Sequence, residues 1–67
     1  NPNNGYFYIS YGCNDCTLNI VNSSGQLILS QKFENQTYAD LTHLKTGLYF
    51  INLVSEKTNI KTKVFIQ

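Results

Sequence analysis

Short runs in which apolar and polar residues alternate recur along this chain, and turn-favouring residues separate them. A period of two is typical of β-strands, because successive side chains of a strand point to opposite faces. No stretch of useful length has the i, i+3, i+4 spacing of an amphipathic helix. The pattern predicts six strands, at residues 6–11, 16–22, 26–33, 36–41, 47–54 and 59–67. Because no crossover helix is available, we expect an all-β fold: an immunoglobulin-like antiparallel β-sandwich of six to seven short strands, with any seventh strand preceding Asn1.

The alternation also predicts which side chains share a face. The apolar residues that lie two apart on one face of their strands are Phe7, Ile9, Tyr11, Leu18, Ile20, Tyr49, Ile51, Leu53, Val64 and Ile66. Residues 26–33 are ambiguous, because Leu27 and Leu29 compete with Ile28 for the core; their register stays open, and a β-bulge is one solution. Gly25 lies in the preceding turn, where it supplies a positive φ that other residues resist.

The length of 67 residues allows one small domain with a thin core. The chain begins abruptly and has no basic-then-apolar leader, so we interpret residues 1–67 as a single domain from a larger protein. No apolar run approaches the roughly 20 residues that span a bilayer, so no transmembrane segment is expected. Five lysines and four acids give a net charge of +1, which offers no phosphate-binding field and argues against nucleic-acid binding.

Residues 40–49 have the features of a corner between two strands. Leu41 and Leu44 are spaced to plug the corner, and Tyr49 lies where a tyrosine corner would bond its hydroxyl to nearby backbone. Gly47 is expected to turn the chain into the next strand; if it needs a positive φ, Gly47→Val should unfold the corner. We interpret these residues as fold markers first.

Cys13 and Cys16 form a CxxC pair, which can be a redox site, half a zinc site or a small disulfide loop. A redox pair favours a helix N-terminus, and none is predicted here. A zinc site needs two further ligands, and the chain offers only His43 besides. We favour the interpretation that the two cysteines form a structural disulfide or remain inert thiols. A disulfide would stabilise the domain only modestly, because the loop that it closes is short. His43 has no catalytic partners in a recognisable motif, so we do not expect this chain to be an enzyme. We also expect it to bind no cofactor and no metal.

Four motifs stand in a recognisable order. They are NPNNG at 1–5, VNSSGQLI at 21–28, LTHLKTGLYFI at 41–51 and KTKVFIQ at 61–67. Together they resemble the type A C-terminal sorting domain of the type IX (Por) secretion system, over essentially the whole chain. The cysteine pair and the missing strand before Asn1 depart from the family pattern.

The resemblance implies an addressing function for a parent protein that ends up secreted or at the cell surface. The parent would cross the inner membrane by an N-terminal signal peptide and pass through the periplasm. Outer-membrane translocon and shuttle proteins of type IX secretion would then recognise this domain. In many members a surface sortase-like peptidase removes it.

We expect recognition to depend on an exposed last strand, to whose edge a partner can add. The candidate recognition residues are Lys61, Lys63, Val64, Phe65, Ile66 and Gln67. Pro2 and Gly5 would shape the entry turn. From physical chemistry alone, lysines on a terminal strand instead indicate protection against edge-to-edge aggregation.

Three other functions stay open at this point. A carbohydrate-binding or adhesive module could use Tyr6, Tyr8 and Tyr11, although the chain has no Trp and alternation places Tyr11 opposite the other two. A redox or metal module would centre on Cys13 and Cys16. The third alternative is a structural linker domain.

Overall fold

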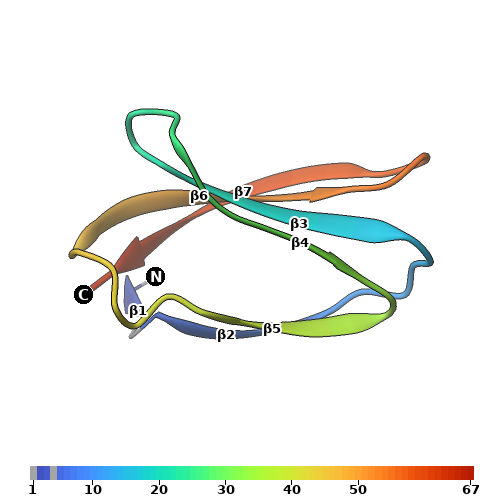
Figure 1. The fold of residues 1–67 in the computed structure, drawn as a ribbon, viewed down its shortest axis with the longest axis horizontal. Helices are drawn as coiled ribbons and strands as arrows, with labels where there is room; N and C mark the ends of the chain where they lie inside the picture. Colours follow the sequence, from blue (N-terminus) through green and yellow to red (C-terminus); the bar gives the residue numbers. More distant parts are fainter. Residues whose placement is uncertain (1, 4) are drawn as a thin grey trace.

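The computed structural model describes residues 2–3 and 5–67, and these form strands and turns without a helix (Figure 1). The seven strands are β1 (Pro2–Asn3), β2 (Tyr6–Ser10), β3 (Cys16–Asn22), β4 (Leu27–Phe33), β5 (Gln36–Asp40), β6 (Gly47–Val54) and β7 (Asn59–Ile66). The predicted all-β class is therefore confirmed. Within the described residues, no helix is long and apolar enough to cross a membrane.

The strands form two layers. One sheet has five strands in the order β1-β7-β6-β3-β4, and the other pairs β2 with β5. Every pairing is antiparallel except that of β1 with β7. Figure 1 shows the two-stranded sheet lying against one face of the larger sheet. This arrangement confirms the predicted small β-sandwich.

The core lies between the two layers, and the alternating pattern predicted much of it. Leu18 and Ile20 of β3 are fully buried. The small sheet covers them with Ala39 and, just beyond β5, Leu41, each about 1% exposed. Phe7 and Ile9 pack against this core from β2. The alternation predicted these positions because each strand has one face against the other layer.

The ambiguity in residues 26–33 is resolved by a bulge. Ile20 lies opposite Leu29 while Val21 lies opposite Leu27, so Ile28 is the extra residue in β4. The bulge turns Leu27 outward, with 57% of its surface exposed, and leaves Ile28 and Leu29 both half-buried. The considered β-bulge is therefore confirmed.

The corner between β5 and β6 is closed by side-chain and backbone hydrogen bonds. The Tyr49 hydroxyl donates to the Lys45 carbonyl at 2.8 Å, which is the bond expected of a tyrosine corner. The Leu44 amide donates to the Leu41 carbonyl at 3.0 Å. Leu41 is buried and Leu44 packs against the core.

The glycine that this corner requires is Gly5 and not Gly47. Gly47 has no positive φ, and a Cβ placed on it would meet no atom within 4 Å. The expectation that Gly47 turns the chain by a positive φ is therefore wrong. Gly5 has φ of 99°, and its Cβ would lie 2.9 Å from the carbonyl atoms of Leu41. Gly25 has φ of 84°, as the turn at its position predicted.

A short strand lies at the start of the described chain. The backbone of Pro2–Asn3 forms β1 and pairs in parallel with the end of β7, with Pro2 opposite Phe65 and Asn3 opposite Ile66. The described residues thus supply seven strands by themselves, the upper number predicted for the sandwich. Asn1 and Asn4 of the first motif lie outside the described residues.

Candidate recognition surface

The last strand, β7, has one paired edge and one partly open edge. It pairs with β6 over its whole length, from Asn59 opposite Val54 to Ile66 opposite Gly47. On its other side β1 pairs only with residues 65–66. Within the described part of the chain, residues 59–64 therefore present their outer backbone groups to no strand. A backbone edge of this kind can accept an added strand.

The six candidate recognition residues do not share one environment. Val64 and Ile66 are buried in the core, with 8% and 1% of their surfaces exposed. Lys61, Lys63 and Phe65 are exposed on the opposite face of the strand, and Gln67 is exposed just beyond it. In the folded domain, a partner can therefore reach no more than the backbone of Val64 and Ile66, and the other four residues are the ones whose side chains it can contact.

The exposed residues of β7 continue into an apolar band that crosses the large sheet. We use the term outer face for the side of this sheet that points away from β2 and β5. Lys63 lies opposite Phe50, and Phe65 lies opposite Leu48. Phe50 in turn lies opposite Val21 of β3. The apolar residues of this band are Phe65, Leu48, Phe50, Val21 and Leu27.

Sequence reasoning missed the contributions of β3, β4 and β6 to this band. Leu48, Phe50 and Leu27 are 37%, 39% and 57% exposed, although all three are large and apolar. The sequence did contain a signal for this band. Leu48 and Phe50 alternate with core residues, so β6 is apolar on both faces. A strand with one solvated face should be polar there, so this departure indicates a binding surface.

A shallow hollow lies in the outer face next to the lysines. Its volume is about 500 Å³, and it is lined by Asn19, Val21, Leu27, Phe50, Ile51, Asn52 and Lys61. The Asn52 Oδ1 atom is buried and has no hydrogen-bond partner among the described residues. A buried acceptor without a partner costs free energy, so this side chain is held there at a cost to stability.

The outer face is positively charged. Lys32, Lys61 and Lys63 lie on it, because they are opposite the outward residues of neighbouring strands. The chain's four acids lie elsewhere: Asp15, Glu34 and Glu56 are in turns between strands, and Asp40 is in the small sheet. The face therefore combines an apolar band with cations that have no acid beside them on the sheet.

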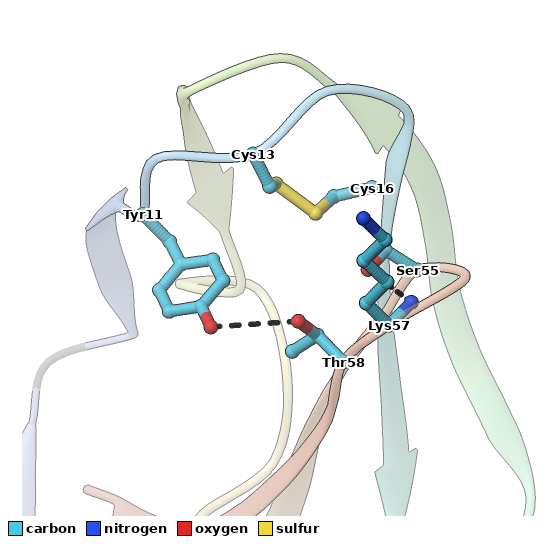
Figure 2. Close-up of a disulfide and its surroundings, with 6 residues drawn as sticks. All are labelled: Tyr11, Cys13, Cys16, Ser55, Lys57 and Thr58. Carbon is cyan, nitrogen blue, oxygen red and sulfur yellow. Dashed lines mark hydrogen bonds between the residues drawn. A yellow bond between two sulfur atoms is a disulfide. The ribbon is translucent and has the colours of Figure 1, made fainter.

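The region around the cysteines forms a separate feature. Figure 2 shows Cys13 and Cys16 joined by a disulfide beside the turn that connects β6 and β7. Cys16 is fully buried and belongs to the core. The oxygens of Tyr11 and Thr58 lie 3.5 Å apart between the loop and this turn. No group of three or more metal-binding side chains occurs within the described residues.

His43 and Asp40 lie in the corner and do not assemble a reactive site. Asp40 Oδ1 accepts hydrogen bonds from the Thr42 hydroxyl at 2.6 Å and the Thr42 amide at 3.0 Å. These bonds, the hydroxyl's first, lower the pKa of the Asp40 carboxyl, and the nearby His43 lowers it further. The arrangement is an Asx-type turn that fixes the start of the corner.

Comparison with protein families assigns the chain. The family model for the secretion system C-terminal sorting domain matches residues 1–67. The chain belongs to this family. No curated protein and no solved structure matches it. Membership identifies the sorting domain as a C-terminal signal for type IX secretion and implies a secreted or cell-surface parent protein. The family is one of sorting signals and not of enzymes.

Proposed function

We propose that the type IX translocon recognises this sorting domain on its outer face, beside the open edge of β7. The supporting observation is the coincidence of three features at one strand. Lys61 and Lys63 project there with no acid beside them on the sheet, Phe65 begins an exposed apolar band, and residues 59–64 have an open backbone edge.

The chemistry of this surface favours a partner strand that carries acidic and apolar side chains. The backbone of such a strand would pair with the open edge of β7. Its carboxylates would pair with Lys61 and Lys63, and its apolar side chains would cover Phe65 and Phe50. Charge complementarity contributes mainly to the encounter rate and to the register of pairing. The same lysines repel the edge of a second copy, so they protect against aggregation while they select the partner.

The wider route follows from this recognition. The parent would enter the periplasm, and outer-membrane translocon and shuttle proteins would bind the folded domain and carry the parent to the surface. A surface sortase-like peptidase would then remove the domain. Recognition of the folded state agrees with the burial of Val64 and Ile66, because an address on the outer face exists only when these residues hold β7 in the sheet.

A secretion assay with charge-matched variants tests the proposal. The chain is fused to the C-terminus of a fluorescent protein that folds after export, in a bacterium with type IX secretion. We expect the double variant Lys61→Gln with Lys63→Gln to lower the secreted fraction about two- to tenfold. This is the decrease in affinity expected when two solvent-exposed ion pairs with the partner are lost. The control is Lys45→Gln with Lys57→Gln, which removes the same charge from turns outside the outer face.

The outcomes separate recognition from folding. Thermal melting of both double variants should match the unmodified domain, because all four side chains are exposed. Equal secretion of the two double variants would overturn the proposal, since the position of the charges would then not matter. Phe65→Thr provides a second test, because it shortens the apolar band and keeps strand propensity. We expect it to retain the reporter in the periplasm.

A further inference from the structure

The outer side of the two-stranded sheet carries a row of exposed aromatic rings. Tyr6, Tyr8 and Tyr38 are 52%, 53% and 56% exposed. The ring centroid of Tyr38 lies 6.0 Å from that of Tyr6 and 5.0 Å from that of Tyr8. The three rings therefore form a continuous surface, which we call the tyrosine strip. Tyr11 and Tyr49, the chain's other tyrosines, turn towards the core.

Polar side chains flank the tyrosine strip at both ends. Asp40 lies opposite Tyr6 in the register of the two strands, and Gln36 lies opposite Ser10. The Tyr8 hydroxyl donates to Gln36 Oε1 at 2.7 Å. This bond fixes the Tyr8 ring and leaves the Gln36 amide nitrogen as the group that can donate to a ligand. The face thus has aromatic rings in its middle and hydrogen-bonding groups at its edges.

Cross-strand packing explains only part of this arrangement. Tyr8 and Tyr38 are directly opposite each other, and such a pair stabilises a two-stranded sheet. Tyr6 lies opposite Asp40 and extends the aromatic surface along the strand. Each of the three residues is still more than half exposed, so the packing between the rings leaves a large aromatic surface open to solvent.

We propose that the tyrosine strip binds a neutral glycan chain of β-linked, glucose-type pyranose rings. When all ring hydroxyls are equatorial, the two faces of a pyranose present only C–H groups, and these pack against the electron-rich face of an aromatic ring. The equatorial hydroxyls then point sideways, where Asp40 and Gln36 can hydrogen-bond them. The rings of Tyr6 and Tyr8 are tilted by 30° and 47° from that of Tyr38, so the strip suits a single twisted chain better than a flat crystalline surface.

The charge of this face selects against other stacking ligands. Among the described strand residues that share the face with the tyrosines, the one charged group is the carboxylate of Asp40. Single-stranded nucleic acid also stacks on aromatic rings but needs cations along its phosphates. The chain's lysines in strands lie on the outer face of the other sheet. Glycan binding is therefore a separate property from sorting, on the opposite layer of the molecule (Figure 1).

NMR titration of the 67-residue chain with cellohexaose tests the proposal without any substitution. We expect the ring signals of Tyr6, Tyr8 and Tyr38 to shift with a Kd on the order of 1 mM, typical of a short and open aromatic surface. The signals of Tyr11 and Tyr49 serve as internal controls and should stay in place. No shift up to about 10 mM cellohexaose, or equal shifts at all five tyrosines, would overturn the proposal.

A matched pair of variants adds a second readout. Tyr38→Thr removes the central ring and keeps strand propensity, and we expect it to weaken cellohexaose binding about fivefold or more. Phe50→Thr removes an exposed ring from the outer face and should leave binding unchanged. If Tyr38→Thr does not fold, the shifts of the unmodified chain decide. Tighter binding of a proline-rich peptide than of cellohexaose would identify a peptide site and refute the glycan.

Discussion

Replacement of Gly5 by Ala should destabilise this domain strongly, because Gly5 is buried although it lies close to the N-terminus. Gly5 has φ of 99°, in a region that residues with a Cβ rarely adopt. Its carbonyl accepts a hydrogen bond from the Leu41 amide at 2.6 Å, which ties the entry to β2 to the end of β5. A Cβ on residue 5 would lie 2.9 Å from the backbone carbon and oxygen of Leu41.

The expected magnitude has two parts. The left-handed conformation costs a residue with a Cβ about 1–2 kcal/mol. Relief of the contact with backbone atoms adds about 1–3 kcal/mol, as for other overpacked positions, because backbone cannot rotate away as a side chain can. A loss of about 3 kcal/mol is a large share of the roughly 3–10 kcal/mol expected for a domain of this size. It corresponds to a decrease in Tm of about 12–24 °C.

Thermal and urea unfolding, followed by circular dichroism, measure this loss. Gly47→Ala is the matched control, because residue 47 has no positive φ and open space around its Cβ position. We expect its Tm to stay unchanged or to rise by a few degrees, since the unfolded chain loses conformational freedom. A Tm of Gly5→Ala within about 2 °C of the unmodified domain would refute the reasoning.

Two further predictions concern the same corner. Tyr49→Phe removes the bond to the Lys45 carbonyl and should cost about 1 kcal/mol, measured as a decrease in Tm of about 4–8 °C, whereas an unchanged Tm would mean that this bond does not stabilise the corner. Thr42→Val removes the hydroxyl donor to Asp40, so the pKa of that carboxyl, followed by NMR, should rise towards its ordinary value. Because folding lowers this pKa, the stability it contributes is present at neutral pH and is lost as the pH falls below about 4. The acid-induced loss of stability should therefore be smaller in Thr42→Val; a pKa that stays low would contradict the assignment.

The regular alternation of apolar and polar residues correctly predicted the first and last residues of two central strands, β3 and β6. The expected ranges 16–22 and 47–54 are the observed bounds of β3 and β6. These strands contain no bulge, and each has one face fixed by the core. The prediction failed where the cause is a contact distant in sequence. Gly5 needs its conformation because of Leu41, and no local pattern of residues around either position reveals that approach.

The candidate surface was predicted only in part, for a similar reason. The sequence pattern places Lys61 and Lys63 on one side of the last strand, and the structure agrees. The apolar band and the tyrosine strip depend on which strands are neighbours and in which register. Phe50 meets Lys63 and Val21 only because β6 lies between β7 and β3, and Tyr38 meets Tyr8 through the pairing of β2 with β5.

The two faces of β7 also change how the sorting address has to be tested. Deletion of residues 63–67 is expected to block secretion, but it removes Val64 and Ile66, which are core residues, and the segment that pairs with β1. A truncated domain would therefore lose its fold together with its lysines. Substitutions on the outer face alone separate the two effects, because alternation assigns the core to even positions of residues 63–66 and solvent to odd ones. Retention of a well-folded Lys61→Gln, Lys63→Gln variant in the periplasm would thus establish recognition by side chains, which truncation cannot do.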